Sequence, residues 1–168
     1  MKLNTLEELY IDQLKDLFNA ETQLLKALPK MSTAATAPEL KKAFDEHLAE
    51  TEDHIDRLKT IFKELEISPQ GKTCKAMTGL LAEGSETISE DADPCVKDAA
   101  LIAAAQRVEH YEMAGYGCVR TYARLLGHDD AADLLQTTLD EEGSVDKRLT
   151  DLAESVINLE AVNPAQDA

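Results

Sequence analysis

Residues 103–122 read AAAQRVEHYEMAGYGCVRTY, and this stretch decides how the chain folds. Its apolar side chains recur every three or four residues, which predicts a helix with one face toward a core. Glu112 occupies a position in that apolar stripe, and Glu109 lies one turn earlier on the same face. Burial of an uncompensated charge is strongly unfavourable. Neither Lys nor Arg lies in the core stripe of any predicted helix, so we predict that a metal ion is the partner.

The composition favours one helical domain. The chain has 168 residues, which is enough to bury a core. Hydrophobic residues make up 43%, much of it Ala and Leu, and aromatic residues only 4%, a mixture that favours helix over sheet. The formal net charge is -16, which argues against nucleic acid and anionic membranes as partners. Cations are the natural ligands of such a surface, although most exposed Asp and Glu residues serve solubility alone.

Two features bear on the compartment. Residues 1–8 contain no apolar segment, so we expect no secretory signal, and no apolar run approaches membrane-spanning length. The three cysteines form no CxxC pair and cannot all be bridged, which fits a reducing cytoplasm. We interpret them as small apolar residues rather than reactive thiols. They are Cys74, Cys95 and Cys118.

Four long helices and one short helix are expected, with no strand. Thr5-Leu6-Glu7-Glu8 is a capping box that opens the first helix, and Pro29 is expected to end or kink it. Pro38 falls in the first turn of the second helix, where its missing N–H is harmless. Asp93 caps the long fourth helix and Gly127 closes it. The predicted helices span residues 5–33, 37–67, 73–90, 93–126 and 129–160.

Short links join the first helix to the second and the fourth to the fifth, so each pair forms an antiparallel hairpin. Residues 68–93 form a long connection between the hairpins and carry the short helix. The predicted fold is therefore an all-α four-helix bundle with a short extra helix in the long crossover. Residues 1–160 form a single domain, and residues 161–168 form a flexible C-terminal tail.

Each long helix places at least one acidic residue on its apolar side. In a bundle these carboxylates converge near the middle, where they cannot all ionise without cations. Oxygen-rich ligand sets with one or two imidazoles suit iron or manganese, and two bridged metals would neutralise the cluster. The inward carboxylates are Glu21, Glu50, Glu109, Glu112 and Glu142, and His54 and Asp146 lie one turn beyond Glu50 and Glu142.

The histidines and the remaining acids have alternative interpretations. His54 is a candidate terminal ligand, and Asp53 is an open alternative beside it. His47, one turn before Glu50, is predicted to support the site through a hydrogen bond or to fill the core. His110 points away from the centre and is predicted not to bind metal. Any single glutamate at the edge of a stripe could also be a solvated side chain.

One run on the fourth predicted helix resembles a known family. Residues 98–106, DAALIAAAQ, are followed after Arg107 by residues 108–112, VEHYE. Together they closely resemble the YciE/YciF family of bacterial ferritin-like stress proteins, and the resemblance covers residues 3–155. Further matching segments are Ala20-Glu21 with Gln23-Leu24, His47–Thr51 and Leu149–Ala153.

This resemblance implies a ferritin-like or rubrerythrin-like bundle, usually dimeric, around a di-iron centre. Manganese is the alternative metal because it accepts the same ligand set. Asp146 stands where better-known di-iron proteins have a histidine. On the family pattern the ligands are Glu21, Glu50, Glu109, Glu112 and Glu142, with His54 and Asp146 as further candidates.

Three functions fit such a site. The first is a ferroxidase that oxidises Fe(II) with oxygen or peroxide in stress protection, with the five glutamates as catalytic residues. In this hypothesis Glu109 or Glu112, together with one helix-hairpin partner, bridges the metals, and Glu21 and Glu142 are terminal ligands. The second is a metal-binding or structural stress protein without turnover, motivated by the missing second histidine. The third is a di-manganese, catalase-like enzyme.

The expected assembly is a homodimer, formed through helical faces that the bundle core does not use. Its expected partners are metal ions and oxygen or peroxide, and neither nucleic acid nor membrane. Spare apolar surface for the dimer is predicted at Met77, Leu81, Leu125 and Leu126.

Overall fold

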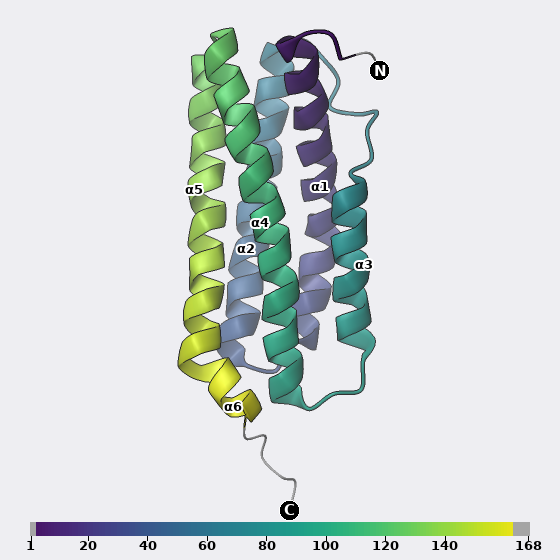
Figure 1. The fold of residues 1–168 in the computed structure, drawn as a ribbon, viewed down its shortest axis with the longest axis vertical. Coiled ribbons are helices and arrows are strands. Elements are labelled where there is room, and N and C mark those ends of the chain that lie inside the picture. Colours follow the sequence, from purple (N-terminus) through teal and green to yellow (C-terminus); the bar gives the residue numbers. More distant parts are fainter. Residues whose placement is uncertain (1–2, 163–168) are drawn as a thin grey trace, which may run out of the picture.

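The computed structural model describes residues 3–162, and all the regular structure within that range is helical (Figure 1). The prediction of an all-α fold is therefore confirmed. Four long helices, one shorter helix and a bent C-terminal segment follow one another along the chain. They are α1 (Leu6–Ala34), α2 (Pro38–Glu64), α3 (Lys75–Ser89), α4 (Pro94–Leu126), α5 (Asp129–Leu152), the π-helical stretch η1 (Ala153–Ile157) and α6 (Asn158–Val162).

The long helices form two antiparallel hairpins, α1 with α2 and α4 with α5 (Figure 1). The end of α2 and the start of α4 lie at opposite ends of the bundle, and α3 runs between them against α1 and α4. This is the predicted four-helix bundle with an extra helix in the crossover. No predicted end of the first four helices differs from the structure by more than three residues.

Side-chain caps set the start of α1 and of α4. The Thr5 hydroxyl accepts a hydrogen bond from the Glu8 N–H at 3.1 Å, and the Glu8 carboxylate accepts from the Thr5 N–H at 3.2 Å, which confirms the capping box. Asp93 accepts from the Cys95 N–H at 2.9 Å and begins α4 as predicted. Each cap satisfies N–H groups that the first turn of a helix leaves without a partner.

The start of α2 is capped from another helix. Asp98 of α4 is only 3% exposed, and its two carboxylate oxygens accept from the N–H groups of Thr36 and Ala37 at 2.8 and 2.7 Å. Asp98 is thus a buried acid whose hydrogen bonds are satisfied by the fold itself. It provides a reference for the buried acids described below.

Helix α1 continues through Pro29 and ends at Ala34, one residue beyond its predicted end at residue 33. The last predicted helix differs more from the structure. The predicted helix over residues 129–160 is interrupted by η1, after which α6 turns toward α4 at the end of the bundle (Figure 1). The wide π-helical turn keeps Ala153 and Ile157 buried while the chain changes direction. The predicted tail begins at residue 161, but residues 161–162 belong to α6, and residues 163–168 lie outside the described range.

The core consists of two apolar halves. One half holds Leu24 and Leu28 of α1 with Leu101 of α4, and the other holds Leu14 of α1 with Tyr116 of α4. In every long helix the stretch between the two halves contributes buried polar side chains instead. The bundle is therefore divided across its middle by a polar layer, and its apolar halves exclude water from either side.

The end of α4 supports a stability test. Gly127 has φ +80°, a left-handed conformation that a side chain disfavours, so Gly127→Ala is expected to destabilise the fold by about 1 kcal/mol. Gly117 lies inside α4 with open space around its Cβ position, so Gly117→Ala is expected to stabilise the fold by about 0.5–1 kcal/mol. Urea unfolding of both variants measures the two shifts, and equal signs would contradict the assignment of Gly127 as a helix terminator.

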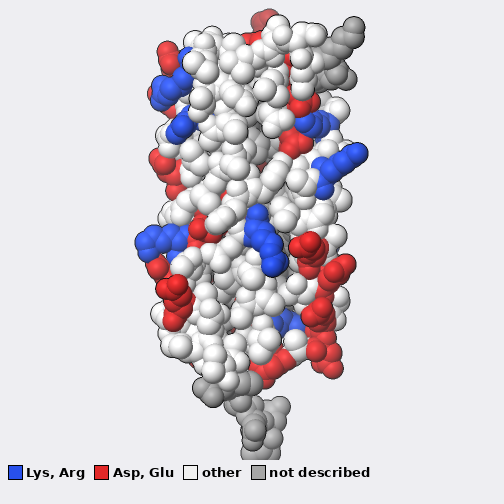
Figure 2. Space-filling view, viewed as in Figure 1, with Lys and Arg blue, Asp and Glu red and all other residues white. Residues whose placement is uncertain are grey.

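The face in Figure 2 carries its acidic side chains mainly along the two edges, and its middle is mostly uncharged. Leu125, near the end of α4, is exposed as predicted, whereas Met77 is fully buried in the core and supplies no spare surface. The homodimer stays a prediction. No helix within residues 3–162 combines the length and hydrophobicity needed to span a membrane.

Candidate metal centre

The polar layer contains six ionisable residues, drawn from all four long helices. None of the six is more than 2% exposed. Each follows the apolar stripe of its helix, so the periodicity that builds the core also turns these side chains inward. The six residues of the polar layer are Glu21 of α1, His47 and His54 of α2, Glu109 and Glu112 of α4, and Glu142 of α5.

The layer forms two groups that share one carboxylate. His47, Glu109, Glu112 and Glu142 make the first group, and Glu21, His54 and Glu142 make the second. Within each group one ligand atom per residue lies within 4.8 Å of all the others. The two oxygens of Glu142 face different groups: Oε2 is 3.9 Å from His47 Nε2, and Oε1 is 3.2 Å from His54 Nδ1. Glu142 therefore lies between the two groups, with one oxygen toward each.

Unsatisfied polar atoms concentrate in this layer. Within the described chain nine buried side-chain nitrogen and oxygen atoms have no hydrogen-bond partner, and all but Tyr10 Oη belong to these six residues. Leaving such an atom without a partner costs about 1–3 kcal/mol, so native proteins contain few of them. Both oxygens of Glu112 and both of Glu142 are in this state. A cluster of unpartnered carboxylate oxygens and imidazole nitrogens is the arrangement that bound cations would satisfy.

The orientation of His54 supports the same conclusion. Its Nδ1 lies 3.3 Å from Glu21 Oε1 and 3.2 Å from Glu142 Oε1, yet it makes no hydrogen bond to either. His47 Nε2 is likewise 3.4 Å from Glu109 Oε1 without a hydrogen bond. These atoms are close to one another but are not aimed along N–H···O directions. Ligand atoms that surround a common point have this relationship.

The donor set fits two divalent cations by chemistry and by charge. Carboxylate and imidazole ligands suit first-row metals such as iron and manganese. Four glutamates carry four negative charges when ionised, which two divalent ions neutralise. A buried charge is tolerated only when it is compensated. The residues present therefore fit a dinuclear metal site.

Without metal, the layer holds protons instead. Burial raises the pKa of Glu109 and of Glu112 well above the usual value, and the neighbouring carboxylate Glu142 raises that of Glu109 further. Burial lowers the pKa of His54, but the adjacent Glu142 and Glu21 carboxylates outweigh burial and raise it to about 10. The pKa of Glu142 is lowered because His54 and His47 outweigh the effect of its burial. In the metal-free layer these shifts favour the protonated forms of Glu109, Glu112 and His54 and the ionised form of Glu142.

Two predicted ligands lie outside both groups. The side chain of Glu50 is 42% exposed, and its Oε2 lies 3.4 Å from His47 Nδ1, on the side of the ring away from the carboxylates. Asp146 is 21% exposed and accepts from Gln106 Nε2 at 3.1 Å, with His110 Nε2 at 3.2 Å. The prediction that these two acids join the cluster is corrected by the structure. Both side chains lie at the edge of the layer, where they are partly exposed.

The other predictions for this region vary in outcome. The structure brings Glu21, His54, Glu109, Glu112 and Glu142 together as the sequence predicts. His110 is largely exposed and Asp53 is exposed, and neither residue belongs to either group.

Three contributors go beyond the ligand set that the sequence predicts. His47 is a member of the first group, whereas the sequence predicts a supporting role or a place in the core. Tyr116 donates a hydrogen bond to Glu21 Oε1, and Glu141 accepts from His54 Nε2 at 3.0 Å. The signal for His47 was present, since it shares the apolar stripe of α2 with His54. Glu141 gave no such signal, because its partner is 87 residues away in the sequence.

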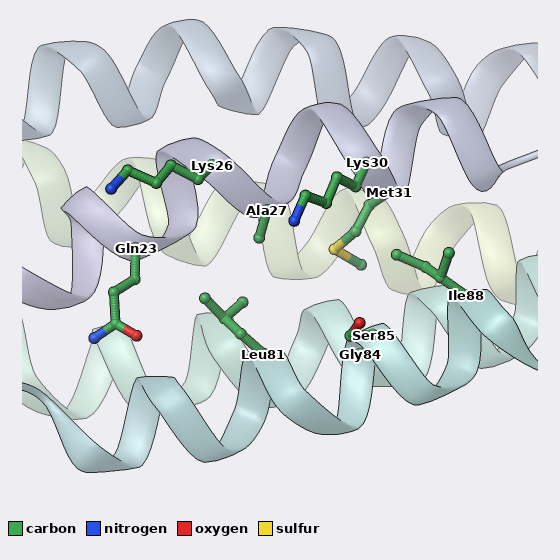
Figure 3. A pocket seen from close by; sticks show the side chains of 9 residues that line it. All are labelled: Gln23, Lys26, Ala27, Lys30, Met31, Leu81, Gly84, Ser85 and Ile88. Atoms are coloured by element: carbon green, nitrogen blue, oxygen red, sulfur yellow. The ribbon is translucent and has the colours of Figure 1, made fainter.

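A groove between α1 and α3 is separate from this layer (Figure 3). Leu81 and Ile88 of α3 point toward α1, and Ala27 and Met31 of α1 complete an apolar lining of a cavity of about 140 Å³. None of the six layer residues lines it, so the groove is not part of the candidate metal centre.

The fold and the layer define a class: a ferritin-like four-helix bundle with a buried carboxylate–histidine cluster suited to metals. The chain belongs to the family described as a domain of unknown function, DUF892, which matches residues 5–162. It is 43% identical to Protein YciF of Escherichia coli K12 over 166 residues, or 98% of this chain and 100% of that protein. The resemblance to the YciE/YciF family is thereby confirmed.

Solved structures agree with this assignment. The crystal structure of the E. coli stress protein YciF superimposes with a TM-score of 0.88 at 42% identity, covering 96% of this chain and 99% of that one. The structure of YcfI from Rhodopseudomonas palustris gives a TM-score of 0.86 at 44% identity, covering 89% and 95%. A protein from Xanthomonas campestris shares the fold alone, with a TM-score of 0.75 at 18% identity over 94% and 96% of the two chains.

Proposed function

We propose that the polar layer binds two iron ions and that the protein is a ferroxidase of the stress response. The observation that carries the proposal is the set of eight unpartnered buried atoms on six side chains of matching ligand type. The stress-response role rests on similarity to YciF, which is described as a stress protein. The ligand types accept both iron and manganese, so the choice of iron rests on the family resemblance.

The reaction treats Fe(II) as a substrate. Two Fe(II) ions each lose one electron, and the pair of electrons reduces dioxygen to hydrogen peroxide with uptake of two protons. With hydrogen peroxide as oxidant, the same two electrons and two protons yield two water molecules. Holding the ions side by side delivers both electrons to one oxidant molecule.

The chain's own residues position the two ions. Glu142 reaches both groups with separate oxygens, so it would help to hold both ions. The Tyr116 hydroxyl donates to Glu21 Oε1 and fixes the orientation of that carboxylate. The apolar halves of the core on both sides of the layer exclude water. Electrostatic interactions within the layer are strengthened as a result.

The test compares two acids on one helix. The metal-free protein is loaded anaerobically with two Fe(II) per chain and mixed with dioxygen or, separately, with peroxide, while the absorbance of Fe(III) is followed. Glu142→Gln removes the ligand shared by both groups, so rapid stoichiometric oxidation is expected to fall at least about 100-fold. Asp146→Asn, one turn further along α5, is the matched control and is expected to retain the wild-type rate.

The outcome also separates the alternative functions. Iron that binds but oxidises no faster than in buffer, with either oxidant, would contradict the ferroxidase and leave a metal-binding stress protein. Manganese loading followed by peroxide disproportionation would support the catalase-like enzyme instead. Failure to bind either metal would contradict every metal-binding proposal and leave a structural stress protein.

A further inference from the structure

We infer that two acids outside the polar layer, Glu141 and Glu50, position the two histidines so that they bind metal through opposite ring nitrogens. His54 binds through Nδ1 and His47 through Nε2. This inference rests on the proposed metal site but not on ferroxidase turnover. It assigns Glu50, which the sequence suggests as a direct ligand, to a positioning role.

The geometry around His54 is the clearer of the two. Its Nε2 lies 3.0 Å from Glu141 Oε2, on the outer side of the layer. Its Nδ1 faces Glu21 and Glu142 on the inner side, without a hydrogen bond. An acceptor at Nε2 favours keeping a proton on that nitrogen, so in the neutral ring that binds a metal the Nδ1 lone pair is directed inward.

Glu141 is itself held in place by Arg57. The guanidinium pairs with both carboxylate oxygens, with Nη2 donating to Oε1 at 2.9 Å and Nη1 donating to Oε2. The same Nη1 donates to the Thr138 hydroxyl at 3.0 Å. A two-point contact between planar groups fixes orientation as well as distance. The His54 ring is thus anchored by a hydrogen-bonded network in which His54 and Arg57 of α2 contact Glu141 and Thr138 of α5.

His47 shows the same relationship with the ring nitrogens reversed. Its Nδ1 lies 3.4 Å from Glu50 Oε2, and its Nε2 faces Glu109 Oε1 at 3.4 Å and Glu142 Oε2 at 3.9 Å. In the described chain no Lys or Arg nitrogen lies within 4.0 Å of Glu50, whose side chain is 42% exposed. Glu50 therefore holds His47 less firmly than Glu141 holds His54.

The sequence spacing explains the reversal. His47 and His54 lie seven residues apart on one face of α2, with ring centroids 6.3 Å apart and ring planes at 65°. Glu50 falls between them along the helix and reaches back to His47, so the acceptor for His54 has to come from another helix. That acceptor is Glu141, adjacent in sequence to Glu142.

The test uses zinc, which is diamagnetic, with the full-length protein. Two-dimensional ¹⁵N NMR of the histidine rings reports which nitrogen is bound to metal and which carries a proton. We expect Zn(II) on His54 Nδ1 and His47 Nε2. Glu141→Leu is expected to lower zinc affinity by about 10–100-fold and to alter the His54 signals, and Glu50→Leu to lower it by less and to alter the His47 signals.

Two further variants separate positioning from loss of structure. Glu141→Gln keeps an oxygen acceptor for His54 Nε2 and is expected to recover most of the affinity lost in Glu141→Leu. Glu52→Leu removes an exposed acid from α2 and is the control, with unchanged affinity and unchanged ring signals.

Coordination of both histidines through the same type of nitrogen would overturn the inference, as would Leu variants that bind zinc like the control. Ferroxidase failure with these NMR results intact would overturn the proposed function alone. Wild-type protein that binds no zinc would overturn both.

Discussion

Protein loaded anaerobically with two Fe(II) per chain at pH 8 is expected to unfold at a temperature about 10–20 °C higher than the metal-free protein. A ligand that binds only the folded state stabilises it by about 4 kcal/mol when its concentration is 1,000 times its dissociation constant. For a chain of this size each kcal/mol raises the midpoint of thermal unfolding by about 2–4 °C. Two ions that satisfy eight unpartnered buried atoms supply a large shift. Anaerobic calorimetry with and without iron measures it.

The size of that shift is expected to grow with pH, because the metal-free protein loses stability as pH rises. Glu109 and Glu112 have raised pKa values in the folded state, so that state binds more protons than the unfolded chain above about pH 4.5. The pKa of His54 is raised from 6.5 to about 10, so its contribution is full below pH 6.5 and is lost as pH rises through about 10. Glu142 has a lowered pKa, so its contribution to folding stability changes only at acidic pH, where it is lost as pH falls.

Between about pH 5 and 9 the metal-free protein is therefore expected to become less stable, by about 1.4 kcal/mol per pH unit for each extra proton bound. Bound metal replaces those protons and removes the trend. Glu142→Gln is the control, since it is expected to abolish most of the iron-induced shift. A metal-free protein that gains stability steadily over this pH range would contradict the assignment of protonated carboxyls to the layer.

The bundle could be predicted from the sequence because its causes are local. Apolar residues at helical spacing, the Thr5 capping box, the Asp93 cap and Gly127 all act within a few residues. Glutamates in the same stripes as the leucines also predicted that a charged layer crosses the core. Where a local signal was absent, as at the π-helical η1, the prediction of one continuous helix was wrong.

The membership of the site depended on rotations that the sequence does not fix. Each residue turns a helix by about 100°, so on α2 Glu50 lies about 60° from His47 and at the edge of the stripe. A small rotation of α2 decides which of the two faces the layer, and packing against the other helices sets that rotation. Asp146 lies only about 40° from Glu142 by the same measure. It is drawn aside by Gln106 of α4, a contact between helices that no periodicity shows.

Replacing Glu112 with glutamine is expected to stabilise the metal-free protein at pH 8 by about 2 kcal/mol while weakening metal binding by more than about 100-fold. Glu112 is fully buried, neither of its oxygens has a partner, and burial raises its pKa well above the usual value. Folding at pH 8 therefore requires either uptake of a proton or burial of a charge. A neutral side chain of the same size avoids both, but it loses a metal ligand.

Asp98→Asn provides the matched comparison on the same helix. Asp98 is equally buried, but its oxygens accept two backbone hydrogen bonds, so this variant is expected to lose about 2 kcal/mol of stability and to bind metal normally. The gain from Glu112→Gln is expected to vanish near pH 4.5, where the carboxyl is protonated in the folded state, and to grow as pH rises. Urea unfolding from pH 4.5 to 8 and metal titration measure both variants. If Glu112→Gln destabilised the metal-free protein as Asp98→Asn does, Glu112 would be a structural acid. The loss of stability caused by burying unpartnered ligands would then have to arise from other residues of the polar layer.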